Sequence, residues 1–223
     1  MFTQESIIEV KSPNFLPNTL AYFGLALLVA LSGVLVGFNA LMSNPQILAN
    51  SGIFWLVIGV EIALAWTAHK WSRNLPLGYW MFAAFAFLTG LTTVPILALA
   101  GSVGGVEIIS RALIASVATF GAAALFGHVT RRNLAGLNGF LMMCLLSVFV
   151  ISIIGIFIPW NNTMEIVISG FIVLLFSGFT MHDIQAIQRM PGISPLLAAT
   201  LLFIDFINIF VGLLRLLIAL RRD

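Results

Sequence analysis

The chain has 223 residues, of which 61% are hydrophobic and 8% are charged, and its mean hydropathy is +1.11. Soluble domains carry about 25% charged residues, so this composition is too apolar for a water-covered surface and predicts an integral membrane protein surrounded by lipid. The net charge of +2 is scattered without a basic run, which argues against a nucleic-acid partner.

Seven apolar stretches are long enough to cross a membrane, which takes about 17 to 25 residues per helix. They cover residues 18–41, 52–71, 77–100, 106–127, 137–158, 165–182 and 196–219. Short segments rich in turn formers and charges separate them, among them "HKWSRNLP", "GSVGG" and "HVTRRNLAG". The sequence therefore predicts one all-α domain over residues 1–223, a bundle of seven transmembrane helices.

The basic residues between the predicted spans indicate an orientation. They lie in alternate connections: Lys70 and Arg73, then Arg131 and Arg132, then Arg189. By the positive-inside rule, these connections and the N-terminus are expected in the cytoplasm. A complete seventh span would leave Arg221 and Arg222 outside, against the rule. Either the tail is an exception or the last helix does not cross fully, and the sequence leaves both possibilities open.

Ionisable side chains inside the predicted spans are the candidate functional residues, because a charge at membrane depth is costly and usually faces the bundle interior. On the last span, Asp205, Asn208, Gly212 and Arg215 are spaced three, four and three residues apart, which places them on one helix face. The last helix is thus expected to carry an inward-facing polar stripe. The ionisable candidates are Glu61, Asp183, Asp205 and Arg215.

Two of these candidates are expected to approach each other. Asp183 closes the sixth span, and Asp205 lies about two and a half turns into the seventh, which enters from the same side. Two carboxylates in a poorly hydrated space cannot both ionise cheaply, so they titrate as a unit. A pair that loses its proton attracts a cation, and oxygen ligands without thiolates suit Ca²⁺. We hypothesise a pH-sensitive cation path in which Asp183 and Asp205 bind the passing ion.

Simpler structural readings compete with this hypothesis. A buried aspartate could pair with Arg215 or Arg73 and pin two helices together without conducting an ion. Glu61 could line a cavity, or it could hydrogen-bond to a neighbouring helix. His182, beside Asp183, is more typical of an interfacial residue than of a metal ligand.

Enzymatic chemistry is not expected. No His-Glu-x-x-His motif occurs, the single cysteine, Cys144, has no histidine nearby, and Ser169 and Ser177 have no plausible base beside them. We therefore expect neither a catalytic site nor a required cofactor.

Four segments, from "FLTGLTTVPILAL" to "LLFIDFINIFVGLLRLL", resemble the Bax inhibitor family, also called the transmembrane Bax inhibitor motif family. "FLTGLTTVPILAL" is similar to that family's third-helix segment from Gly to Pro, and "FGHVTRRNLAGLNGFLMM" is similar to the junction of its fourth and fifth helices. "FTMHDIQAIQ" resembles the Tyr-Asp-Thr-Gln-x-Ile motif that closes its sixth helix, and "LLFIDFINIFVGLLRLL" closely resembles its seventh. The four segments occur in order from about residue 80 onward. The chain therefore resembles a prokaryotic member of this family.

The resemblance implies six helices around a central C-terminal helix, and a pH-dependent Ca²⁺ leak controlled by an aspartate pair. Carried over to this sequence, the pair is Asp183 and Asp205. The family also implies a basic residue near the end of the second helix that holds the first aspartate in the closed state. Arg73 is the nearest candidate and Lys70 the second. Glu61 matches an acid in the second helix of related bacterial proteins.

The sequence departs from the family pattern at three places. His182 and Ile184 replace the usual Tyr and Thr around the first aspartate, and Asn133 stands where the junction usually has Asp. Because histidine titrates near neutral pH, His182 is expected to shift the gating pH.

The expected function is a pH-sensitive calcium leak channel, in a bacterial inner membrane with the N-terminus in the cytoplasm. A different class stays open: a non-conducting regulatory protein that binds a membrane protease or another membrane complex. The residues expected to line or brace the path are Glu61, Asn208, Arg215 and His182.

Overall fold

The computed structural model describes residues 14–43, 51–158, 161–189 and 192–222, and the predicted all-α class is confirmed. Six helices in these residues are long and apolar enough to cross a membrane. Their bounds are α1 Phe15–Ser43, α3 Ser51–Trp71, α4 Leu75–Val129, α5 Asn138–Phe157, α6 Asn162–Arg189 and α7 Pro195–Arg222, and a short 3₁₀ turn, η1, spans Ala135–Leu137.

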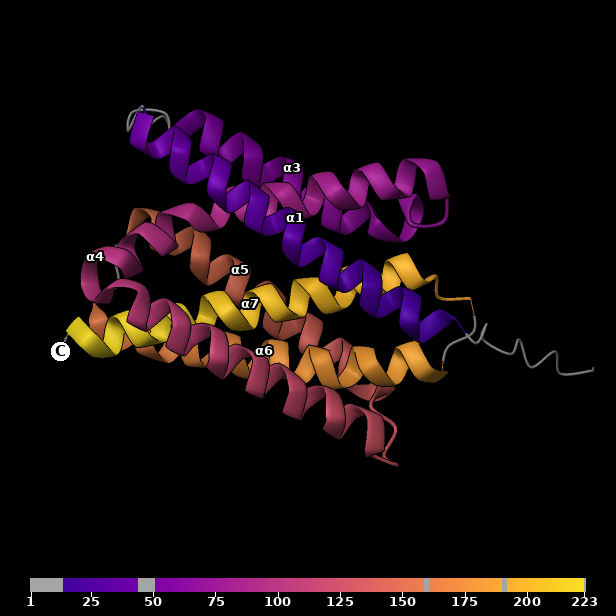
Figure 1. The fold of residues 1–223 in the computed structure, drawn as a ribbon. Coiled ribbons are helices and arrows are strands. Elements are labelled where there is room, and N and C mark those ends of the chain that lie inside the picture. The colour runs from indigo at the N-terminus through magenta and orange to yellow at the C-terminus, as the bar shows by residue number, and fades with distance from the viewer. Residues whose placement is uncertain (1–13, 44–50, 159–160, 190–191, 223) are drawn as a thin grey trace, which may run out of the picture.

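The described helices number six rather than the predicted seven because α4 covers two predicted spans, 77–100 and 106–127. A straight helix of its 55 residues would be about 80 Å long, far more than the hydrocarbon core of about 30 Å. Gly105 breaks it, with φ 64° and ψ −158°, a conformation open essentially only to glycine. Figure 1 shows α4 doubling back, so its first arm (residues 75–104) and second arm (106–129) are the third and fourth predicted spans.

The C-terminal helix is central, as expected. It packs against α1, α3, α4 and α6, whereas α5 packs on the outside against α6. Phe203, Ile209 and Leu214 on α7 have no exposed surface. Figure 1 shows α7 running through the bundle with the other helices around it. Side chains on α7 are therefore the best shielded from lipid.

Small residues let α1 and the first arm of α4 approach closely. A Cβ atom at Gly90 would collide with the backbone carbonyl of Ala30, and one at Gly33 would collide with the carbonyl of Phe87. Lipid is as apolar as the side chains, so helix association in a membrane depends largely on van der Waals packing. Close backbone contact between two helices strengthens this packing. The crossing fixes α1 on α4 beside the central helix.

The bundle has two ends with different charges. The basic end carries the connections 72–74 and 130–134 and the end of α6, and Ser194 Oγ donates there to the Ser72 carbonyl at 3.3 Å. The opposite end, the Gly105 end, carries the turn of α4, the start of α6 and the end of α7 (Figure 1). There Arg221 lies 3.9 Å from Glu107, and Asn162 Nδ2 donates to the Ala219 carbonyl at 3.0 Å.

The last helix therefore runs the whole length of the bundle. Its 28 residues are about 42 Å long, more than the hydrocarbon core requires. The helix is long enough for a complete span, and the side of the membrane on which Arg221 and Arg222 lie stays a prediction.

Candidate functional site

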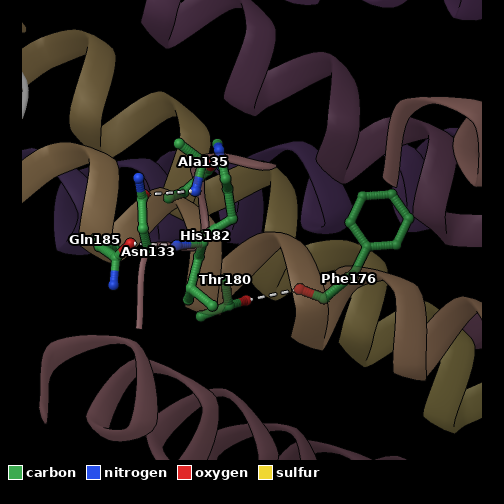
Figure 2. Close-up of polar contacts among 8 residues, drawn as sticks. Asn133, Ala135, Phe176, Thr180, His182 and Gln185 are labelled. Carbon is green, nitrogen blue, oxygen red and sulfur yellow. Dashed lines mark hydrogen bonds and ion pairs between the residues drawn. The ribbon is translucent and has the colours of Figure 1, made fainter. Parts of the chain in front are cut away.

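Asp205 is the most deeply buried acid in the described chain. Its exposed fraction is 2%, and its Oδ2 atom has no hydrogen-bond partner among the described residues. It is close enough to Asp183 of α6 for the two negative charges to repel, and Thr180 is its neighbouring hydroxyl. The Thr180 hydroxyl, however, also donates to the Phe176 carbonyl at 2.8 Å, as Figure 2 shows. Asp205 is thus a carboxyl group without full hydrogen bonding in a protein interior, which is costly when it is ionised.

Asp183 has a histidine as its direct partner. His182 Nδ1 lies 2.7 Å from Asp183 Oδ1, and the two residues are 9% and 8% exposed. His182 thus lies buried against the acid, and its position relative to the membrane interface stays a prediction. His182 contacts Asp183 on α6, and Asp205 on α7 lies near enough to Asp183 for their charges to interact. We call these three residues the acid cluster.

Gln185 holds the acid cluster against the neighbouring connection. Its Nε2 donates to the Arg132 carbonyl at 2.8 Å, and its Oε1 accepts the Leu134 N–H at 2.7 Å. Figure 2 shows it reaching the segment that carries Asn133, whose Oδ1 caps the Ala135 N–H at 3.0 Å. Gln185 is not among the predicted site residues. The available signal is its place two residues after Asp183, in a segment that the structure buries.

The two candidate counter-charges lie at the basic end and form no ion pair with a carboxylate of the described residues. Arg73 Nη2 contacts His69 Nε2 at 2.9 Å, and both Arg73 and Lys70 are exposed. No ion pair in the described residues joins either of them to Asp183 or Asp205. Their role as counter-charges stays a prediction.

A cavity of about 570 Å³ lies between α3, the first arm of α4 and α7, and three predicted path residues line it: Glu61, Asn208 and Arg215. Glu61 also bonds to a neighbouring helix, because its two oxygens accept the hydroxyls of Thr89 and Thr92 at 2.8 Å each. Both sequence readings of Glu61 therefore describe it. His182 is not among the lining residues of this cavity.

Arg215 borders a second cavity of about 260 Å³ at the Gly105 end. Its ion-pair partner is Glu165 at 3.8 Å, and the pair is partly exposed. In the described chain Arg215 therefore pairs with an acid of the α6 start rather than with a buried aspartate. Glu165 is not among the predicted site residues, since it lies at the edge of a predicted span and gives no signal there.

A resident metal site is not apparent in the described part of the chain, where no three His, Cys, Asp or Glu side chains converge on one point. Asp183 and Asp205 supply oxygen ligands from two helices only, whereas Ca²⁺ takes six to eight oxygens, many of them from water or carbonyls.

The comparisons with known proteins agree with this architecture. Residues 12–222 match the family described as inhibitor of apoptosis-promoting Bax1. A Helicobacter pylori protein is 30% identical over 97% of this chain and 91% of its own length. A Streptococcus pyogenes membrane protein is 32% identical over 79% of this chain and 76% of its own. The Escherichia coli inner membrane protein YbhL is 26% identical over 76% of each chain.

The family match covers nearly the whole chain, and the described helices are long and apolar enough to cross a membrane. Two of these relatives are themselves named as membrane proteins. The chain is thus an integral membrane protein, and it belongs to the Bax inhibitor family.

Proposed function

We propose that the protein is a pH-sensitive Ca²⁺ leak channel of a bacterial inner membrane, with its N-terminus in the cytoplasm and with Asp183 and Asp205 as its gate. The observation that carries the proposal is Asp205, a buried acid on the central helix with an unpartnered oxygen beside a second acid. Acids inside a membrane are expensive and are usually kept for a proton or ion function.

The proton controls the gate. When the pair holds a proton, Asp205 is neutral and α6 and α7 pack closely around it. When the proton leaves, two negative charges face each other in a medium of low dielectric, and their repulsion favours separation of the two helices and entry of water. His182, 2.7 Å from the Asp183 carboxylate, is the proposed modulator of this gate. Low pH therefore favours the closed state, and Ca²⁺ flux is expected to rise with pH.

The path continues from the pair along the polar face of α7. Asn208 lies one turn beyond Asp205, and Arg215 about two turns beyond Asn208, both on the wall of the larger cavity. Phe203 and Ile204 line the cavity at the level of Asp205, so apolar side chains contribute to the closed barrier. Ca²⁺ would move through the open path as cargo, held by carboxylate, amide and water oxygens.

Arg73, with Lys70 as the second candidate, is the proposed counter-charge of the closed state. In the structure Arg73 contacts His69, so it would leave that contact to reach Asp183. Glu61 braces the cavity wall through Thr89 and Thr92.

The test is Ca²⁺ flux into liposomes that contain only the purified protein and an enclosed Ca²⁺ dye, with steps of the outside pH. Asp205→Asn removes the charge at nearly constant shape, so flux is expected to fall to the protein-free background at every pH. Glu107→Gln, an acid at the Gly105 end, is the matched control and is expected to keep the pH dependence.

Flux that persists in Asp205→Asn would overturn the proposed gate. No flux at any pH, together with a co-purifying membrane protein, would favour the second class, a non-conducting regulator of a membrane protease or another membrane complex.

A further inference from the structure

The two cavities beside α7 adjoin each other. They share three wall residues: Ile96, Leu99 and Arg215. The larger cavity has mostly apolar walls, and the smaller one at the Gly105 end is lined by Glu165, Arg215 and Arg222 together with asparagines. An elongated ligand with one polar end and one apolar end matches this order.

We propose that the adjoining cavities bind one anionic phospholipid, with its phosphate between Arg215 and Arg222 and one acyl chain in the larger cavity. This site lies apart from the acid cluster, but the larger cavity also carries the proposed ion path past Asn208 and Arg215, so a bound acyl chain would occupy that path. Lipid binding itself does not depend on Ca²⁺ conduction. The acid cluster contributes no side chain to either cavity.

The charges at the mouth favour an anion. Arg215 and Arg222 outnumber the single acid Glu165 among the lining residues of the smaller cavity. The Arg215–Glu165 distance is 3.8 Å, and the Arg215 side chain is 44% exposed, so this ion pair leaves most of the guanidinium donors available. Arg222 makes no ion pair within the described residues. Two guanidinium groups are well suited to the oxygens of a phosphate.

The depth of the two arginines matches a lipid headgroup. Arg222 is the last residue of α7, and Arg215 lies seven residues earlier, about 10 Å deeper along the helix. An arginine below the headgroup level needs an anion or water, because hydrocarbon does not solvate its charge. A phosphate between the two levels would meet both guanidinium groups.

The larger cavity is suited to an acyl chain. Its α7 wall runs from Arg215 back to Phe203, about 18 Å along the helix, with Ile207 and Val211 between them. Its volume of about 570 Å³ lies within the usual range of ligand pockets, about 300 to 1,000 Å³. The one acid in this wall, Glu61, already accepts two threonine hydroxyls, which reduces the cost of placing a chain beside it.

The test is native mass spectrometry of the full-length, delipidated protein in detergent, titrated with phosphatidylglycerol, with phosphatidylcholine, or with glycerol 3-phosphate. One phosphatidylglycerol is expected to bind per chain, more tightly than phosphatidylcholine, whose headgroup has no net charge. Glycerol 3-phosphate carries the phosphate without a chain, and it is expected to bind much more weakly. Equal affinity for the two lipids would overturn the proposal, and glycerol 3-phosphate binding as tight as that of lipid would overturn the placement of the chain.

Two pairs of variants locate the site. Arg222→Gln is expected to weaken phosphatidylglycerol binding about fivefold, the contribution of one arginine near anionic lipid, whereas Arg131→Gln at the basic end leaves it unchanged. Val211→Phe fills the larger cavity and is expected to abolish the bound lipid, whereas Val117→Phe on an exposed face is not. Equal losses within either pair would show that the lipid is bound elsewhere. Because binding is measured without flux, these outcomes are separate from those of the channel test.

Discussion

At the scale of single residues, the acids Glu61 and Asp205 differ in how fully their carboxyl oxygens are hydrogen-bonded. Both oxygens of Glu61 accept a threonine hydroxyl, whereas Asp205 keeps one oxygen without a partner in the described structure. Unsatisfied buried polar groups are rare in proteins because each costs stability. Glu61 is therefore built as a satisfied wall residue, and Asp205 as a group whose protonation state has consequences.

Removing Glu61 and removing its two threonine partners are expected to have different effects on stability. Thr89 and Thr92 also have backbone acceptors in their own helix, the carbonyls of Phe85 at 3.0 Å and of Thr89 at 3.1 Å. Glu61→Leu therefore leaves no hydroxyl without an acceptor, and we expect little loss of stability. Thr89→Val with Thr92→Val leaves the Glu61 carboxylate without donors and is expected to cost about 1 to 3 kcal/mol per lost bond.

The measurement is the thermal unfolding midpoint in detergent for Glu61→Leu, for the double variant Thr89→Val with Thr92→Val, and for the triple variant. In the Glu61→Leu background the two threonine changes are expected to cost little, so the double-mutant cycle should show strong coupling. Additive losses would mean that the threonines act through their own helix and not through Glu61.

Whether the sequence alone predicts a site residue depends on whether its residue type is unusual for its position in the chain. Asp205 and Glu61 stand out because a charge in an apolar run is rare, and the structure places both in the protein interior or on a cavity wall. Gln185 is signalled only by its place beside Asp183, and Glu165 is not signalled at all. Their importance comes from partners far away in the chain, the 132–134 connection and Arg215. Sequence spacing within one helix predicts a shared face, but it does not predict which other helix that face meets.

At the scale of helices, apolar length predicts the spans well but does not predict where one helix element ends. The segment "GSVGG" correctly indicates a turn between two spans, yet α4 runs through it with a break at Gly105 alone. A single glycine in a conformation closed to other residues is enough to reverse the chain, and composition does not reveal which glycine takes it.

The close crossing of α1 and α4 predicts that alanine substitutions at two helical glycines, Gly90 and Gly24, have different effects on stability. In Gly90→Ala the new methyl group meets backbone atoms of Ala30 and Val34, which cannot rotate away. The two helices must move apart, and we expect a loss of about 1 to 3 kcal/mol. Gly24→Ala on α1 meets no atom within 4 Å, so it is expected to be neutral or slightly stabilising.

Thermal unfolding of the two variants in the same detergent checks this prediction. Equal stability of Gly90→Ala and the wild-type protein would mean that α1 does not lie as close to α4 as the structure has it.

At the scale of the whole molecule, the two ends of the bundle differ in whether their arginines are paired with acids. At the basic end, Arg73, Arg131 and Arg132 have no acid partner among the described residues, which is the pattern of a cytoplasmic face. At the Gly105 end, Glu107 lies 2.5 Å from Arg111 and 3.9 Å from Arg221. Local pairing with acids offers a physical reason why the arginines that end α7 can sit on the side opposite to the basic connections.

This arrangement predicts opposite sides of the membrane for the two ends. Cys144 is the only cysteine, so Cys144→Ser gives a background without thiols. In that background, Arg131→Cys is expected to react with an impermeant maleimide only from the cytoplasmic side, and Arg222→Cys only from the other side. Glu107→Cys, at the turn of α4, serves as the control and should label like Arg222→Cys, because Glu107 and Arg221 are in contact. Labelling of Arg131→Cys and Arg222→Cys from one side would mean that α7 does not cross the membrane, and that the central helix enters and leaves on the same face.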